Sequence, residues 1–468
     1  MRNQTIGYLP DERPPLGKLL LYALQQVIVM FPATVAVALI TGFQVSTTIF
    51  ASGIATLFFI LITGKKIPLY YGSSFAYLPA ISGLMAAQGF AKVNGILPIE
   101  GIQIAQFGII ASGLVSIVAG LLVRFVNRDI VDKILPPSVT GPIAMIIGLT
   151  LAGNALSDAA PNGGSNWIWV VSLATLLSTI FFSRYLKGFL GQLPLLLGAA
   201  VGCITAFLIY QFGGENLFRS LPPEALAAST WKFGDGSIFA LPAFSLPKVS
   251  WEAVLAIMPV AIATIPESTA HIYQLDVYVN DLAHKKGKHK YKMANLLDRN
   301  LIGDGICDMI SGVIGGPAGT NYGENISTMA ITKVFSVPVL IVASILAMAI
   351  SCFTPLISVI YAIPLAVIGG LEIYLFGAIA AQGIAILIEK KCDMFSSKNI
   401  AVIATIMVIG LGVNYVYGGT LDFFGMSVPA VAGAAIFGIV LNLLLSIGEK
   451  RKILESNLIK EESENKEN

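Results

Sequence analysis

Six ionisable side chains lie inside long apolar stretches of the sequence. A charge at the middle of a bilayer costs at least roughly 2.5–3.5 kcal/mol, so each of them is a candidate for function. Glu267 and His271 are four residues apart, which places them on one helical face about a turn from each other. A carboxylate facing an imidazole at low dielectric is suited to bind and release a proton near neutral pH. The alternative is that His271 only anchors the end of its helix and that Glu267 is structural.

Asp304 and Asp308 are also one turn apart, in a segment that carries several glycines. They either join the proton site or bond to hydroxyls and to backbone groups freed by a broken helix, and we favour this supporting role. Glu372 either accepts a hydrogen bond at a gate or lies near water, and the sequence assigns it no role.

Glu324 lies in a segment that begins like a loop although it is flanked by apolar runs. The stretch 315–332 opens with three glycines and a proline, and only later reads as a helix. In lipid, unpaired backbone is tolerated only where protein buries it or where it lines a cavity. The stretch therefore predicts a binding site built from a half-helix, with an ordinary loop as the alternative.

A second break lies far away in the sequence, at 70–79. Tyr71-Gly72-Ser73-Ser74 and Tyr322-Gly323-Glu324-Asn325 share a Tyr-Gly step followed by two polar residues. Interrupted segments at corresponding positions of two halves are the best sequence pointer to a transporter site.

The composition is that of an integral membrane protein. The 468 residues are 55% hydrophobic and 12% charged, with a mean hydropathy of +0.78. A net charge of +2 does not indicate nucleic acid binding, and the four cysteines show no metal or disulfide spacing. With three histidines and no nucleophile–base set, the sequence does not indicate an enzyme. The apolar run that begins near Leu16 is interpreted as a retained span rather than a signal peptide.

We expect an all-α polytopic fold with about fourteen transmembrane segments. The expected spans are 16–41, 46–63, 70–89, 103–124, 136–156, 167–184, 190–211, 251–272, 297–314, 318–333, 336–353, 358–388, 400–416 and 427–447. The twelfth is long enough to bend at Pro364 or around Gly369-Gly370. Lysine and arginine gather in alternate loops, which predicts that both termini are cytoplasmic.

Seven spans per half is an odd number, so two similar halves must be inverted relative to each other. A second internal similarity supports the repeat. The stretch 135–141 in the fifth span, which begins Leu135-Pro136-Pro137 and ends at a glycine, resembles 363–369 in the twelfth span. The charged tail, 450–468, is expected to fray into disorder.

The predicted site would suit a small planar heterocycle. Glu267 and Glu324 accept hydrogen bonds, and backbone amides at the starts of two half-helices donate them. Phe75, Tyr77 and Tyr322 offer flat apolar walls. A nucleobase, which has both N–H and C=O edges, satisfies all of these groups, whereas a simple anion would be repelled by two acids.

At these residues the sequence resembles the nucleobase–cation symporter family, also called the nucleobase–ascorbate transporter family. The similarity covers nearly the whole chain, and its most specific parts are 321–326 and 330–333. Glu324 stands where the bacterial uracil–proton symporters, or uracil permeases, carry Glu and where xanthine, urate and purine members usually carry Gln. Within the family the chain therefore resembles the uracil permeases.

The resemblance implies two inverted seven-span repeats folded into core and gate domains. The core would comprise 16–127 and 250–354, the gate 128–249 and 355–449, and the cytoplasmic tail 450–468. The broken third and tenth spans would pair as short antiparallel strands, and the protein would dimerise through its gate domains.

The resemblance also implies roles for single residues. Glu267 and Glu324 would bond the uracil edge, amides at Phe75 and Gly323 would bind its carbonyls, and His271 would act with both acids in proton coupling. Tyr322 and Ser74 complete the expected substrate-binding set, with Asp304 and Asn325 supporting it; neither metal nor cofactor is expected. Ser327, Gln26, Phe376 and Asp308 depart from the family pattern.

We therefore expect a proton-driven uracil importer of the bacterial inner membrane that works by alternating access in the lipid bilayer. A xanthine or other purine permease of the same family is the near alternative, and an anion transporter of the same architecture is a more distant one. Sodium remains an alternative coupling ion, because carbonyls and hydroxyls that hold it leave no mark in a sequence.

Overall fold

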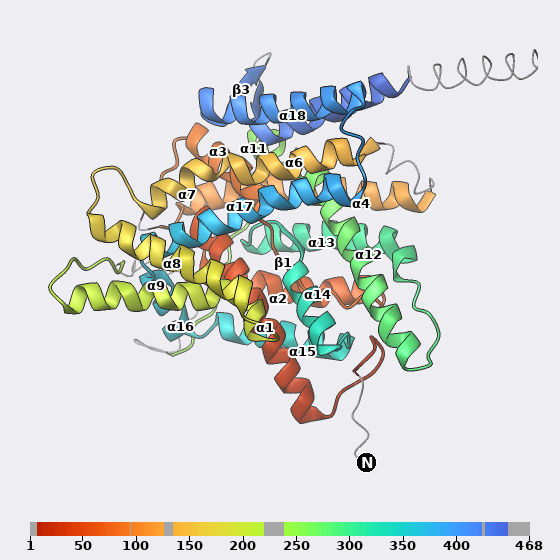
Figure 1. Ribbon diagram of the computed structural model, residues 1–468, viewed down its shortest axis with the longest axis horizontal. Coiled ribbons are helices and arrows are strands. Elements are labelled where there is room, and N and C mark those ends of the chain that lie inside the picture. The colour runs from red at the N-terminus through yellow and green to blue at the C-terminus, as the bar shows by residue number, and fades with distance from the viewer. Residues whose placement is uncertain (1–6, 94, 126–133, 220–237, 424–425, 448–468) are drawn as a thin grey trace, which may run out of the picture.

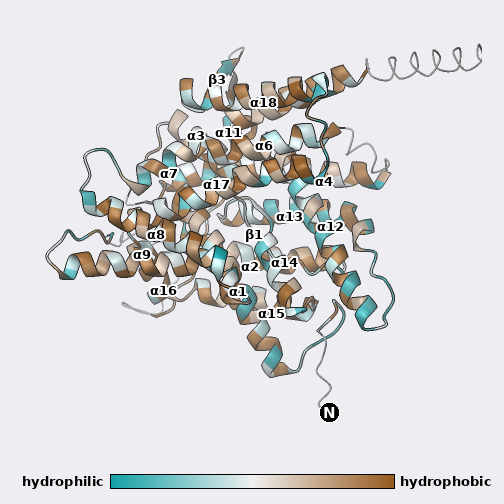
Figure 2. Ribbon diagram, in the orientation of Figure 1, coloured by the Kyte–Doolittle hydropathy of each residue, from teal (hydrophilic) through white to brown (hydrophobic). Residues whose placement is uncertain are grey.

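The computed structural model describes residues 7–93, 95–125, 134–219, 238–423 and 426–447, so the predicted tail lies outside the described residues. These residues form a mostly helical protein (Figure 1). Ten helices in this part of the chain are long and apolar enough to cross a membrane, and Phe75–Ala87 and Val337–Ser351 are shorter apolar helices. Figure 2 shows the long helices as mainly hydrophobic, with hydrophilic residues gathered at loops and helix ends. The architecture is that of a polytopic membrane protein.

The helices follow the predicted order. Their bounds are α1 Leu16–Thr41, α2 Val45–Ile62, α3 Leu78–Ala87, α4 Ile99–Phe125, α6 Pro137–Thr150, α7 Ala152–Ala159, α8 Asn166–Tyr185, α9 Pro194–Gln211, α11 Trp251–Ile257, α12 Ala261–Lys285, α13 Leu297–Ile314, α14 Gly323–Thr332, α15 Val337–Ser351, α16 Thr354–Ala362, α17 Leu365–Glu389 and α18 Ser397–Val416. A last apolar helix covers Ala430–Ile447.

Three predicted spans differ from the helices observed. The span 358–388 is divided at Ile363-Pro364 into α16 and α17, so the bend at Pro364 is confirmed and the one at Gly369-Gly370 is wrong. The span 136–156 is divided at Leu151 into α6 and α7. The predicted end at residue 272 is also wrong, because α12 continues to Lys285. The sequence turns polar there, but Leu275, Val279 and Leu282 keep a helical spacing and are buried.

Two pairs of short strands interrupt the helices. A hairpin of β3 (Thr420–Phe423) and β4 (Met426–Pro429) follows α18 and was not predicted. The other pair lies near the centre of the molecule, where β1 is seen beside α13 and α14 (Figure 1). Here β1 (Tyr71–Ser73) pairs antiparallel with β2 (Gly319–Asn321), with Gly72 opposite Thr320. Two segments about 250 residues apart in sequence thus meet at the two predicted breaks.

Glycines allow the helices around the β1–β2 pair, here called the crossing, to pack closely. A Cβ at Gly305 of α13 would lie 2.2 Å from the carbonyl oxygen of Gly113 in α4, and one at Gly113 would lie 2.4 Å from the oxygen of Gly305. On the other side, a Cβ at Gly53 of α2 would lie 2.7 Å from the oxygen of Ser344 in α15. These backbone contacts leave no room for a side chain and fix α13 and α2 beside the strands.

Candidate substrate-binding site

Each strand of the central pair leads directly into a helix N-terminus. After β1, Ser74 caps the short 3-10 helix Phe75–Tyr77, its Oγ accepting a hydrogen bond of 3.3 Å from the Ala76 amide, and α3 continues from there. After β2, Tyr322 precedes α14, which begins at Gly323. The first amides of a helix have no partner within it and carry the positive end of the helix dipole. Two sets of hydrogen-bond donors therefore flank the crossing, as the two breaks predicted.

The helix α12 brings the first predicted acid to the start of α14. A Cβ at Gly323 would lie 3.0 Å from His271 Nε2, so the imidazole packs against the first residue of α14. One turn earlier in α12, Glu267 is close enough to Glu324 for the two carboxylates to interact electrostatically. Glu324 is exposed and Glu267 half-buried, whereas their neighbours Asn325 and Ser268 are buried. The two acids are therefore more accessible than the residues that follow them in the chain.

His271 lies in the interior of its helix and not at its end. It is buried, and α12 continues for fourteen residues beyond it. Its Nδ1 has no hydrogen-bond partner among the described residues. The interpretation of His271 as an anchor of the helix end is therefore wrong.

Asp304 holds β2 against α12 and α13. Its carboxylate accepts hydrogen bonds from the Ser268 hydroxyl and, at 2.9 Å, from Asn321 Nδ2. Asn321 Nδ2 also donates to Ser268 Oγ at 3.0 Å, as does Asn300 Nδ2 at 2.8 Å. Because Ser268 follows Glu267 in α12 and Asn321 ends β2, this network fixes the first acid relative to the strand that leads to the second.

Asp308, one turn further along α13, ties both strands together. Its Oδ1 accepts a hydrogen bond of 2.6 Å from the Tyr71 hydroxyl of β1 and one of 2.7 Å from the Gly319 amide of β2. Its Oδ2 lies 3.5 Å from the hydroxyl of Tyr77, which also bonds Ser112. Asp308 therefore bonds to groups of the protein that form or adjoin the crossing, and its role is to support the two strands.

The remaining predicted residues have different surroundings. Phe75 is half-buried at the first turn after β1. Tyr322 is buried, and its hydroxyl donates to the Ser73 carbonyl at 3.0 Å and lies 2.9 Å from Thr34 Oγ1, so its polar end is used within the protein. Asn325 donates to Gln26 Oε1 at 2.7 Å, which attaches α14 to α1.

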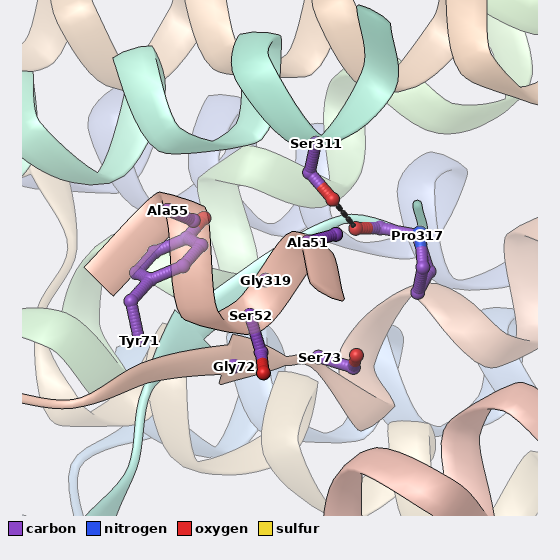
Figure 3. A pocket seen from close by; sticks show the side chains of 9 residues that line it. All are labelled: Ala51, Ser52, Ala55, Tyr71, Gly72, Ser73, Ser311, Pro317 and Gly319. Atoms are coloured by element: carbon purple, nitrogen blue, oxygen red, sulfur yellow. Dashed lines mark hydrogen bonds between the residues drawn. The ribbon is translucent and has the colours of Figure 1, made fainter. Parts of the chain in front are cut away.

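A hollow lies behind the strands, between them and α2 (Figure 3). It is lined by Ser52 and Ala55 of α2, Tyr71 and Gly72 of β1, and Ser311, whose hydroxyl donates to the Pro317 carbonyl at 2.6 Å. The hollow has no room for a water molecule, and none of the six predicted substrate-binding residues lines it. It is a packing gap rather than a ligand site.

Glu372 lies apart from this site. It is buried in α17, and neither of its carboxylate oxygens has a hydrogen-bond partner among the described residues. Its electrostatic neighbours are Asp158 of α7 and Lys92, which lies in the loop before α4. The described residues contain no group of three or more His, Cys, Asp or Glu side chains that could hold a metal ion.

The sequence reasoning missed three members of the polar network: Ser268, Asn300 and Asn321. A local signal existed for Asn300, because Asn300, Asp304 and Asp308 follow one another at a spacing of four and so share one face of α13. The contacts of Ser268 and Asn321 join segments far apart in sequence. Asn321 opens the motif 321–326, but the motif does not indicate these contacts.

Comparison with known proteins decides which family has this arrangement. The model of the Permease family matches residues 17–418. The chain belongs to this family, the nucleobase–ascorbate transporter family. It is 36% identical to the uracil permease of Bacillus caldolyticus over 93% of this chain and 94% of that protein. It is 31% identical to the uracil permease of Escherichia coli (strain K12) over 97% of this chain and 98% of that protein.

A solved structure of another transporter shares the fold. The transmembrane domain of a cyanobacterium bicarbonate transporter matches with a TM-score of 0.57 and 16% identity, over 92% of this chain and 97% of that one. At this identity the likeness concerns the fold alone. Family membership makes the permease a multi-pass membrane transporter and not an enzyme.

Proposed function

We propose that this permease imports uracil together with protons by alternating access. The observation that carries the proposal is the pair of carboxylates, Glu267 and Glu324, at the start of α14, with a second helix start following the paired strand β1. Support for the substrate comes from the relatives, since both proteins compared above are named uracil permeases.

Uracil fits the groups of the site by its hydrogen-bonding edges. Its flat ring carries two N–H donors and two carbonyl acceptors. The carboxylates of Glu267 and Glu324 accept from the N–H groups, the amides at Phe75 and Gly323 donate to the carbonyls, and the ring of Phe75 stacks on the base. Ser74 and Tyr322 hold the two helix starts in place through their own hydrogen bonds.

Proton coupling follows from placing two acids in one site. Two carboxylates that face each other repel, and one proton removes the repulsion and supplies a hydrogen-bond donor. Protonation of Glu267, with His271 exchanging the proton through water, therefore favours uracil binding, and loss of that proton to the cytoplasm weakens it. Sodium in place of the proton would leave binding independent of pH.

We also propose the architecture that this cycle requires: fourteen segments in two inverted repeats, with core and gate domains divided as the sequence predicted. Helix contacts support the repeat. In a fourteen-segment count, α2 and α15 are the second and eleventh segments, and α13 and α4 are the ninth and fourth. Adding seven to the second segment gives the ninth, and subtracting seven from the eleventh gives the fourth. The repeat would therefore relate one closely packed pair to the other. Dimerisation through the gate domains, cytoplasmic termini and a bacterial inner membrane location complete the proposal.

Uptake of labelled uracil by cells that lack their own uracil transporter tests the function. Glu267→Gln and Glu324→Ala are expected to abolish proton-coupled uptake at normal membrane levels of the protein. Glu389→Gln, which neutralises an exposed acid at the end of α17, is the matched control and is expected to transport normally. Normal uptake by both site variants would exclude this site.

The same cells distinguish the alternatives. Uptake of xanthine without uracil would assign the site to a purine. Transport of a simple anion is disfavoured because Glu324 stands where an anion would bind, at the N-terminus of α14.

A further inference from the structure

Residues Gly7–Glu12, here called the N-terminal strap, cross the ends of two helices that carry site residues. The strap runs beside the link between α14 and α15. The Tyr8 amide donates to the Lys333 carbonyl at 2.8 Å, the Phe335 amide donates to the Tyr8 carbonyl at 2.8 Å, and the Val337 amide donates to the Pro10 carbonyl at 3.0 Å. Tyr8 and Val334 form a parallel β-bridge. The strap is thus bonded to the residues that end α14.

The same strap is bonded to the end of α12. Lys286, the residue after α12, donates from Nζ to the Gly7 carbonyl at 3.0 Å and forms an ion pair with the Glu12 carboxylate. Glu12 also accepts a hydrogen bond of 2.9 Å from the Leu9 amide, and its carbonyl accepts one of 2.6 Å from Ser336 Oγ. The Glu12–Lys286 pair is partly buried, with side chains 27% and 16% exposed, so water screens it less than a surface pair.

The strap is built into the protein rather than laid on its surface. Tyr8 and Leu9 are buried within the main apolar cluster. A Cβ at Gly7 would lie 2.3 Å from the Lys333 carbonyl oxygen, and the φ of Gly7 is +142°, which other residues rarely adopt. Only glycine fits where the strap passes the end of α14.

The two helices that the strap joins carry the acids of the site. Glu267 and His271 are in α12, and Glu324 is in α14, a helix of only ten residues. Helices this short are marginal without outside support. β2 holds the first end of α14, and the strap is bonded to Lys333 and Lys286, the residues that follow α14 and α12.

We propose that the N-terminal strap is a brace that sets the position of α14 against α12, with Glu12 and Lys286 as its positioning residues. The distance between Glu267 and Glu324 then depends on a contact outside the site. Within the described residues, the hydrogen bonds that leave the strap run to the ends of α12 and α14, to the links beside them and to the first residue of α15. The brace therefore belongs to one rigid body and stays closed throughout a transport cycle. The inference rests on the nucleobase transport proposed above, but its first test does not.

That first test is hydrogen exchange of the α14 amides in purified protein. Lys286→Met keeps the apolar stem and removes the donor, and the amides of α14 are expected to exchange about tenfold faster than in the wild type. Lys285→Met is the matched control: Lys285 is the preceding residue and forms an exposed pair with Asp281. It is expected to leave the exchange unchanged, and equal exchange in both variants would overturn the brace.

Transport kinetics provide the second readout. If the brace positions the acids, Lys286→Met raises the KM for uracil by about tenfold with a smaller change in kcat, because the ground-state site is displaced. Glu12→Gln keeps one hydrogen bond, and its KM for uracil is expected to lie between the values of Lys286→Met and the wild type. A loss of kcat with unchanged KM would contradict a positioning role. Faster exchange in a protein that moves no nucleobase would support the brace and contradict the proposed function.

A cross-link distinguishes a brace from a latch. In a background in which the four native cysteines are replaced by alanine, Tyr8→Cys with Val334→Cys places two thiols at the β-bridge. The reduced protein serves as its own control for folding. We expect uptake in the oxidised protein equal to that in the reduced protein. Loss of uptake on oxidation, restored by a reductant, would show that the strap must open and would overturn the proposal.

Discussion

Replacing Asp308 tests how the two strands are held together. Its Oδ1 is the acceptor for both the Tyr71 hydroxyl and the Gly319 amide. In Asp308→Ala both buried donors lose this acceptor, at about 1–3 kcal/mol for each unsatisfied donor, so the folded state loses about 2–6 kcal/mol. The Tyr71 hydroxyl retains a contact of 3.2 Å with the Asp304 carbonyl, which places the expected loss in the lower half of that range.

Asp308→Asn is the matched variant, because its amide oxygen accepts the same two bonds without the charge. We expect the thermal unfolding midpoint of the purified protein to fall in the order wild type, Asp308→Asn, Asp308→Ala. Adding Tyr71→Phe to Asp308→Ala removes one orphaned donor, so the double variant is expected to be less destabilised than the sum of the two single variants by about 1 kcal/mol. An Asp308→Ala protein as stable as the wild type, or strictly additive effects, would refute this reading of the crossing.

Three further predictions follow from single contacts. Gly305→Ala is expected to lower the unfolding midpoint and the membrane level of the protein, because its Cβ would lie 2.2 Å from a backbone oxygen of α4. Gly377→Ala, with open space around it, is the control and is expected to be neutral or stabilising. Equal unfolding midpoints for the two variants would contradict the close packing. Gln26→Ala removes one of the two acceptors of Asn325 Nδ2, the side-chain Oε1, and leaves the Gln26 carbonyl at 3.0 Å. It is expected to weaken uracil binding severalfold, as measured by calorimetry, and unchanged affinity would show that the side-chain bond does not position α14. In Glu267→Gln, any uracil binding that remains is expected to depend less on pH between 5 and 8 than in the wild type, because only Glu324 and His271 of the coupling residues can still titrate. A wild-type pH profile would place the coupling proton elsewhere.

The two breaks and the residues near them could be predicted because their signals are local. Glycine and proline in an apolar run mark an interrupted helix, and an acid in such a run marks an interior site. The spacing of Glu267 and His271 placed both on one face of α12, where the structure has them. Pro364 was one of two predicted positions for a bend, and its fixed φ and missing amide proton explain why the helix divides there.

What sequence patterns did not predict depends on contacts between distant segments. Hydropathy marks only the length of chain that prefers lipid, so the predicted span ended at residue 272. The helix α12 continues to Lys285 with a polar outer face. The bond between Asn325 and Gln26 joins residues 299 apart, and the β-bridge of Tyr8 with Val334 leaves no periodic signal. Tyr322 was expected to offer a flat wall, yet its hydroxyl bonds β1 and α1, a use that depends on how the chain crosses itself.

Thermal stabilisation of the purified protein by a panel of nucleobases tests the central claim most directly. A ligand that binds the native state raises its unfolding midpoint, so the panel ranks the ligands without requiring a transport assay. Uracil, xanthine and hypoxanthine would be compared at two pH values, with and without sodium. The two-carboxylate site predicts that uracil alone stabilises, more strongly at the lower pH, and without any need for sodium. Stabilisation by xanthine but not uracil, or by uracil only when sodium is present, would contradict it.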